Sequence, residues 1–251
     1  TGSTEVGRIL LKEAADQVLT TSMELGGNAP FLVCADADIT EALDGAMVAK
    51  MRNGGEACTA ANRFYVAREV YDEFAKRLTD RMAALTVGEG ADPATELGPM
   101  VNAEAVDKID ELVQGAVAEG ARVLTGGHKL NRPGHYYAPT VLADVPPTAE
   151  ILKNEIFGPV APLVAFDNED EAVRLANDTE FGLISYVFTS DLRRGLDLSG
   201  KMESGMVALN RGLASDPAAP FGGTKASGLG REGSTDGIHE YLETKYIATT
   251  L

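Results

Sequence analysis

Hydrophobic and polar positions follow two different periods along the chain. Apolar residues that recur three and four positions apart predict amphipathic helices, and they occupy residues 5–15, 39–51, 69–85, 103–119, 169–177 and 192–201. Short apolar runs predict buried strands, and they occupy residues 31–34, 63–66, 122–124, 136–141, 160–166, 184–189 and 206–210. Because the two kinds of segment alternate, we expect an α/β fold built on a twisted, largely parallel sheet.

Glycine-rich segments interrupt this pattern at residues 53–60 and 212–233. Long loops with little regular structure of their own are often functional, so both are candidates for a ligand site. Thr4 is the expected cap of the first helix. The β-prone residues 246–251 predict a short strand at the end of the chain.

Composition narrows the class of protein. With 251 residues, 44% hydrophobic and 24% charged, the chain has the balance of a globular protein with one large domain or two smaller ones. It contains no apolar run of about 18 residues, so we expect no membrane span. The net charge of −16 disfavours nucleic acid and anionic membranes as partners, because most of the surface would repel phosphates. Local arginines in a cleft can still bind an anionic substrate.

Two cysteines, Cys34 and Cys58, are too few for a disulfide framework and fit a reducing cytoplasm. Cys34 ends an apolar run that predicts a buried strand, so we interpret it as structural. The three histidines are widely spaced, and we expect no metal-ligand cluster.

Cys58 and Glu24 are the candidates for chemistry, since each lies beside paired glycines. Glycines let the backbone approach a ligand closely, and a thiolate is the best side-chain nucleophile near neutral pH. A carboxylate able to activate water would then hydrolyse an acyl group carried by the sulfur. From the residues alone, the alternative that Cys58 is a small buried hydrophobe is equally good.

Five segments, in order along the chain, resemble signature motifs of the aldehyde dehydrogenase superfamily. They are residues 1–8, 24–28 (Glu-Leu-Gly-Gly-Asn), 54–60 around the cysteine, 155–159 (Glu-Ile-Phe-Gly-Pro) and 220–228 (Pro-Phe-Gly-Gly-Thr-Lys-Ala-Ser-Gly). Within the superfamily, residues 50–53, 210–217 and 228–246 are most similar to succinate-semialdehyde dehydrogenases. The resemblance implies an aldehyde dehydrogenase-like fold, with a catalytic domain and the late part of a Rossmann-like cofactor domain.

The resemblance also implies roles for single residues. Cys58 is the implied nucleophile and Glu24 the implied base for water. The implied cofactor is NAD or NADP, with its phosphates at the start of the first helix. The residues implied to bind it are Gly2, Ser3, Gly7, Leu25, Glu155 and Phe157.

The implied reaction is oxidation of succinate semialdehyde to succinate. Arg52 and Ser215 are implied to hold the distal carboxylate of the substrate, and Phe221 to line the aldehyde tunnel. The alternatives are another small aldehyde such as glutarate semialdehyde, or a truncated chain that retains only assembly. Glu56 departs from the family motif, which usually has glutamine, and its charge is expected to raise the pKa of the Cys58 thiol.

The chain looks like the C-terminal half of such an enzyme, because it begins at the phosphate-binding turn. We expect residues 1–26 to be a remnant of the dinucleotide-binding domain and residues 27–227 to form the catalytic domain. Residues 228–242 are expected to return to the cofactor domain. Residues 243–251 resemble the strand by which subunits of the family pair, so a homodimer or homotetramer is expected.

Overall fold

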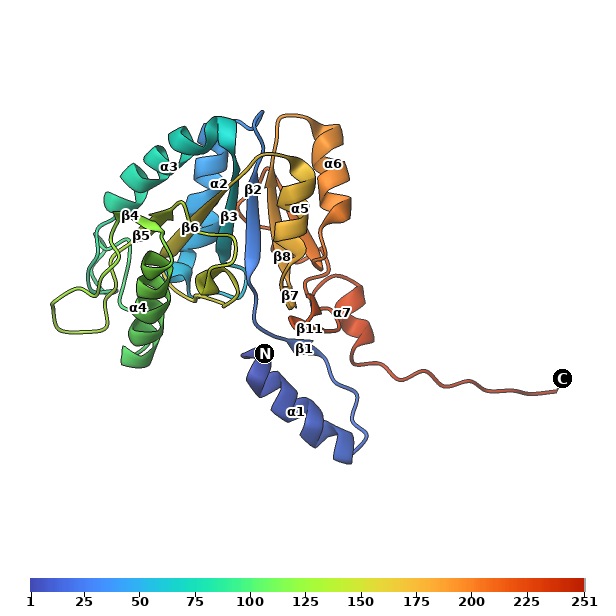
Figure 1. Cartoon of the computed structure of the whole chain (residues 1–251). Coiled ribbons are helices and arrows are strands. Elements are labelled where there is room, and N and C mark those ends of the chain that lie inside the picture. The colour runs from blue at the N-terminus through green and yellow to red at the C-terminus, as the bar shows by residue number, and fades with distance from the viewer. Residues whose placement is uncertain (251) are drawn as a thin grey trace.

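A seven-stranded sheet forms the centre of the computed structural model, which describes residues 1–250 (Figure 1). Its strand order is β4-β5-β6-β3-β2-β8-β9. The strands are β2 (Ala29–Val33), β3 (Ala61–Ala67), β4 (Arg122–Thr125), β5 (Thr140–Ala143), β6 (Val160–Phe166), β8 (Ile184–Phe188) and β9 (Met206–Leu209). Only the edge pair of β4 and β5 is antiparallel, while the other pairs of this sheet are parallel. The predicted α/β fold with a largely parallel sheet is confirmed.

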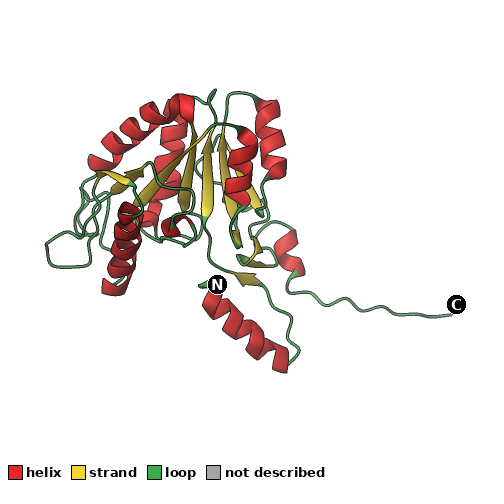
Figure 2. Ribbon diagram, in the orientation of Figure 1, coloured by secondary structure: helices red, strands yellow, loops and turns green. Residues whose placement is uncertain are grey.

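Helices cover both faces of the sheet, as the red helices on either side of the yellow strands show in Figure 2. One face packs against α2 (Ile39–Met51) and α3 (Arg68–Ala83). The other packs against α4 (Ala103–Ala118), α5 (Glu169–Asn177) and α6 (Leu192–Lys201). Neighbouring residues of β2 divide between the two cores, Phe31 on one side and Leu32 on the other, because side chains alternate along a strand.

The remaining elements lie outside the seven-stranded sheet and the five helices that cover it. They are α1 (Thr4–Asp16), η1 (Arg52–Gly55), η2 (Glu150–Leu152), α7 (Asp236–His239) and four two-residue strands: β1 (Met23–Glu24), β7 (Phe181–Gly182), β10 (Thr224–Lys225) and β11 (Gly228–Leu229). β1 pairs with β11, and β7 with β10. Figure 1 shows α1 standing away from the sheet layers. The face of α1 that carries Val6, Ile9 and Leu10 is 43–58% exposed at these residues.

Most predicted elements agree with the structure to within two residues, and three differences have physical reasons. Ser3 rather than Thr4 caps α1, since its hydroxyl accepts from the Val6 N–H at 3.3 Å. The strand predicted at 136–141 begins only at Thr140, after Pro139, which has no N–H for a ladder. The strand predicted at 246–251 is absent from residues 246–250, where the chain contacts no partner strand, and Leu251 lies outside the described residues.

Candidate active site

The candidate residues meet at the edge of the sheet where the parallel strands begin. Glu24 precedes β2, Cys58 precedes β3 and Glu155 precedes β6. Because β2, β3 and β6 are parallel neighbours, their amino ends share one edge. Ligands of open α/β sheets usually bind at the opposite, carboxyl edge. The sheet therefore brings together three segments that are distant in sequence, at the less usual end.

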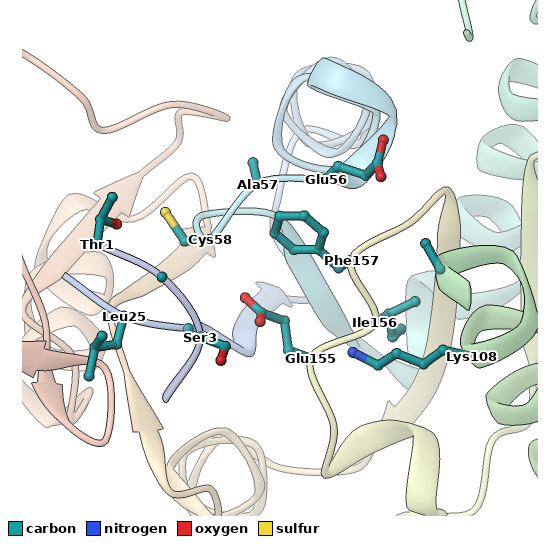
Figure 3. A pocket seen from close by; sticks show the side chains of 13 residues that line it. Thr1, Ser3, Leu25, Glu56, Ala57, Cys58, Lys108, Glu155, Ile156 and Phe157 are labelled. Atoms are coloured by element: carbon teal, nitrogen blue, oxygen red, sulfur yellow. The ribbon is translucent and has the colours of Figure 1, made fainter. Parts of the chain in front are cut away.

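A cavity of about 530 Å³ opens at this edge, a volume within the range of small-molecule sites (Figure 3). The segments around it are the start of α1, the turn after Glu24, the cysteine loop, α4 and the loop before β6. Its lining residues are Thr1, Gly2, Ser3, Leu25, Gly26, Glu56, Ala57, Cys58, Ala105, Lys108, Glu155, Ile156 and Phe157. Six of the predicted site residues thus surround one space. Figure 3 shows the Cys58 sulfur and the Glu155 carboxylate on its walls.

The loop that carries Cys58 turns sharply out of α2. Asn53, Gly54 and Gly55 all have positive φ, at 53°, 64° and 79°, a conformation that glycine adopts without steric cost. A Cβ added to Gly27 would lie 2.1 Å from the Cys58 carbonyl oxygen. The close approach of these two backbones explains one glycine of the pair after Glu24, and it places Glu24 beside the cysteine.

The electrostatics of Cys58 and Glu24 are coupled. Burial raises the pKa of Glu24 to about 7, the nearby Cys58 thiol partly offsetting the shift. Burial also raises the pKa of Cys58 to about 12, and the adjacent Glu24 carboxylate adds to that rise. Glu24 Oε1 is buried without a hydrogen-bond partner among the described residues. A carboxylate with a pKa near 7 is suited to take a proton in neutral solution.

Glu56 does not have the effect expected from its position in the sequence. Its Oε1 accepts from the Val101 N–H at 3.1 Å. The carboxylates that raise the pKa of the Cys58 thiol are instead Glu24 and Glu155. Although Glu56 is only two residues from Cys58 in the sequence, its side chain bonds the Val101 backbone instead of facing the thiol.

Glu155 lines the cavity next to the glycine pair. Its Oε1 accepts from the Gly27 N–H at 2.9 Å. Burial raises the pKa of Glu155, while the Gly27 N–H, Lys108 and Lys50 act in the opposite direction. Phe157 follows on the cavity wall with a φ of 56°, an uncommon conformation for a bulky residue.

The start of α1 faces the cavity through Gly2 and Ser3. Ser3 caps the helix, and the Gly2 N–H donates to the Glu24 carbonyl at 3.1 Å. Gly7 does not line the cavity. A Cβ there would lie 2.4 Å from Leu25 Cδ1, so Gly7 lets Leu25 pack against the helix. The helix N-terminus presents free N–H groups and a positive dipole end, as an anion site requires.

Lys108 is a cavity residue that sequence reasoning missed. It lies on α4 and lines the cavity with Glu155, and Figure 3 shows its side chain reaching in from the α4 side. The residue falls within an ordinary amphipathic helix, whose spacing carries no sign of a ligand site. Only the packing of α4 beside the loop before β6 places this cation at the site.

The predicted substrate residues lie outside this cavity. The Arg52 Nη2 donates to the Thr59 hydroxyl at 3.0 Å, one residue beyond Cys58. Ser215 is exposed. Phe221 lines a separate cavity of about 200 Å³ with Ala214, and both pack against the same core cluster as Cys58. The structure therefore does not bring Arg52, Ser215 and Phe221 into the cavity that Cys58 lines.

Comparison with known proteins decides the family. A sequence profile described as the aldehyde dehydrogenase family matches residues 1–247. The chain belongs to the aldehyde dehydrogenase family. The resemblance drawn from the five motifs is thereby confirmed.

The most similar relatives of this aldehyde dehydrogenase chain include semialdehyde dehydrogenases. Succinate-semialdehyde dehydrogenase of Paenarthrobacter nicotinovorans is 54% identical, covering 98% of this chain and 55% of that protein. Glutarate-semialdehyde dehydrogenase of Pseudomonas putida is 49% identical, covering 100% of this chain and 52% of that protein. The chain therefore spans about half the length of the curated relatives it matches.

Solved structures agree with the family. An NADP-dependent enzyme of E. coli superposes with a TM-score of 0.98 at 47% identity, over 100% of this chain and 52% of that one. An NAD+ complex of an aldehyde dehydrogenase from Bacillus cereus superposes with a TM-score of 0.94 at 34% identity, over 96% of this chain and 49% of that one. In residues 1–250, no helix is long and apolar enough to cross a bilayer. The same residues contain no group of three or more potential metal ligands.

Proposed function

We propose that this chain carries the catalytic residues for oxidising succinate semialdehyde to succinate with NAD(P)+. The observation that carries the proposal is the position of Cys58, whose sulfur lines the cavity while its pKa is coupled to Glu24 and Glu155. Membership of the aldehyde dehydrogenase family supports the reaction class. The names of the relatives, for succinate and glutarate semialdehydes, support the substrate class.

In the proposed reaction, the Cys58 thiol releases its proton to solvent and the sulfur attacks the aldehyde carbon, giving the oxyanion of a thiohemiacetal. We assign the Cys58 backbone N–H as a donor to the oxyanion, a type of contact worth about 3 kcal/mol in other enzymes. NAD(P)+, when bound, would supply the hydride acceptor, and loss of a hydride from the thiohemiacetal carbon would leave a thioester on the sulfur. Glu24 then takes a proton from the water that attacks the thioester, so that the acid leaves and the thiol is restored.

The residues around the cavity fit the nicotinamide end of a dinucleotide. The capped N-terminus of α1, at Gly2 and Ser3, offers a place for phosphate. We assign Glu155 as the acceptor for ribose hydroxyls, and Lys108 supplies a cation to the same cavity. Leu25 and Phe157 add apolar surface, and Gly7 acts by letting Leu25 pack.

For the substrate end, we assign the distal carboxylate to Arg52 and Ser215, with Phe221 on the path of the aldehyde. The guanidinium of Arg52 bonds the hydroxyl next to the nucleophile, and it can instead bind a carboxylate bidentately. Glutarate semialdehyde is the second candidate, favoured by the glutarate-specific name of a 49% identical relative.

We also propose that this chain is the C-terminal half of a longer enzyme that assembles as a homodimer or homotetramer. Half-coverage of the relatives supports the first part. The exposed apolar residues Tyr246 and Ile247, at 88% and 77%, support a partner for residues 243–251. In the proposed division, residues 1–26 and 228–242 belong with the cofactor domain, and residues 27–227 form the catalytic domain.

The experiment that tests the function is NAD(P)H formation from succinate semialdehyde and from glutarate semialdehyde. It compares this chain with a version extended by the N-terminal half of a relative, each with and without Cys58→Ala. We expect turnover only in the extended version, faster with succinate semialdehyde, and abolished by C58A. Turnover that survives C58A would refute the mechanism. A folded extended version inactive on both aldehydes would favour a chain that retains only assembly.

A further inference from the structure

A lysine is buried behind the candidate site. Lys50, in the last turn of α2, is only 1% exposed, and so is Asn62 at the start of β3. The Lys50 ammonium donates to Asn62 Oδ1 at 2.9 Å. Neither side chain reaches solvent, and Asn62 Nδ2 has no hydrogen-bond partner among the described residues.

Burial of the Lys50 side chain lowers the stability of the fold. Burying an ammonium without a close counter-ion costs several kcal/mol, and no carboxylate of the described residues lies within 4.0 Å of its nitrogen. Burial lowers the pKa of Lys50 to about 7, and the charge of Glu155 partly opposes the shift. An apolar side chain would serve packing better at this position, so stability alone does not account for the lysine.

The positions of Lys50 and Asn62 in the chain suggest why a lysine is buried here. Lys50 precedes the loop that carries Cys58, and Asn62 follows it, so their hydrogen bond joins the two ends of the loop. Two further side-chain bonds are nested inside: Arg52 to the Thr59 hydroxyl, and Asn53 Nδ2 to the Glu56 carbonyl. The backbone bonds within this loop are local turns, from the Glu56 N–H to the Asn53 carbonyl and from the Ala60 N–H to the Ala57 carbonyl. Side chains, rather than a backbone ladder, hold the loop closed.

We propose that Lys50 is a positioning residue, which holds the nucleophile loop closed through Asn62 and thereby fixes the Cys58 sulfur against Glu24 and the cavity. The inference rests on the proposed function in that it takes Cys58 as the nucleophile. The Lys50–Asn62 bond is the outermost and most buried of these three bonds, so its loss removes the side-chain contact between the end of α2 and the start of β3. A small displacement of a reacting group costs large factors in rate.

The test uses four variants of the 251-residue chain: Lys50→Met, Asn62→Leu, the double variant, and the exposed lysine Lys76→Met as control. Each is alkylated with iodoacetamide at pH 8, with Cys34 as the internal reference, and its melting temperature is measured. We expect both single variants to melt lower, because each leaves a buried polar group without a partner. The double variant replaces both partners by apolar groups and should recover the lost stability.

The labelling of Cys58 separates positioning from stability. In the wild-type chain the thiol is held in a buried place beside Glu24, which raises its pKa to about 12. We expect at least fivefold faster alkylation of Cys58 in K50M, in N62L and in the double variant, with Cys34 and the K76M control unchanged. A double variant that recovers the wild-type labelling rate along with its stability would overturn the proposal.

Turnover in the extended enzyme adds a second readout. We expect K50M/N62L to lower kcat about tenfold while KM for NAD(P)+ stays within twofold. If C58A retains turnover, the proposed function fails, whatever the labelling shows. If C58A is inactive but the double variant labels and turns over as wild type, only the role of Lys50 fails.

Discussion

A cysteine and a carboxylate lie close together at each end of the parallel strands, at the carboxyl edge and at the amino edge, but their surroundings differ. At the carboxyl edge, Cys34 follows β2, and Asp36 beside it accepts from the Thr189 hydroxyl and pairs with Arg194. Burial acts to raise the pKa of Asp36, but Thr189 and Arg194 outweigh it, and the pKa is lowered. At the amino edge, Cys58 lies next to Glu24, whose Oε1 has no partner among the described residues.

Both cysteines have a pKa of about 12, raised first by burial and then by neighbouring carboxylates. The pKa values of the two thiols therefore do not distinguish the carboxyl edge of the sheet from the amino edge. The difference lies in the carboxylates and in the space: the Glu24 pKa is raised to about 7, and a cavity opens beside Cys58. A buried carboxylate without a hydrogen-bond partner, next to a thiol that lines a cavity, is the arrangement expected of a reactive site, whereas a carboxylate satisfied in an ion-pair network stabilises the fold.

Replacing each cysteine in turn by alanine should give the largest difference between the two edges. In the extended enzyme we expect Cys58→Ala to lower kcat by about 1000-fold or more, because it removes the proposed nucleophile. Cys34→Ala should leave kcat within about twofold and lower stability by about 1 kcal/mol, since it removes a small buried group. Steady-state kinetics measure kcat of both variants, and thermal melts measure their stability. Equal losses in the two variants would mean that the edges do not differ in function.

The carboxylate at the amino edge should control rate through its protonation. We expect Glu24→Gln to slow steady-state turnover about 100-fold. In the wild-type enzyme kcat should rise with pH through about 7, where Glu24 becomes the basic form. The profile of E24Q should lack that rise. A rise that persists in E24Q would assign the titration to another group.

Protonation of Glu24 should also appear in stability. Its folded pKa of about 7 lies above the value of 4.5 for the unfolded chain. The stabilising contribution is therefore complete below pH 4.5 and is lost as the pH rises through about 7. Denaturant titrations between pH 5 and 8 should show a smaller loss of unfolding free energy in E24Q than in the wild type. Parallel curves for the two proteins would contradict the raised pKa.

The close contact of Gly27 with Cys58 allows a smaller perturbation of the same edge. Gly27→Ala would place a Cβ 2.1 Å from the Cys58 carbonyl oxygen, so the loop must shift, and we expect a ten- to hundredfold lower kcat, by analogy with about 1 Å misplacements elsewhere. The matched control is Gly90→Ala, where a Cβ meets nothing within 4 Å. Unchanged turnover in G27A would show that the site tolerates the displacement.

The smallest effect is expected at the carboxyl edge. Asp36→Asn weakens the bonds to Thr189 and Arg194 at a partly exposed site, which should cost about 1 kcal/mol, or roughly 2–4 °C in melting temperature. Turnover should remain within about twofold. A large loss of activity without a loss of stability would extend the functional region to this edge.

The sequence by itself determined the local structure and the family, and it singled out the candidate residues for chemistry. The helices 39–51, 169–177 and 192–201 and the strand 160–166 have the predicted bounds, because their periodicity is a property of adjacent residues. The paired glycines near Cys58 and Glu24 were also evident from the sequence, and the close approach of the Gly27 and Cys58 backbones requires a glycine at position 27.

Only the tertiary structure decided which groups share a site. The parallel pairing of β2, β3 and β6 brings Glu24, Cys58 and Glu155 to one edge. The packing of α4 adds Lys108, and the burial of α2 turns Lys50 inward against Asn62. It also directs Glu56 to the Val101 amide and away from the thiol. These contacts, and the pKa shifts that follow from burial, join residues far apart in the chain, and no local pattern of side chains encodes them.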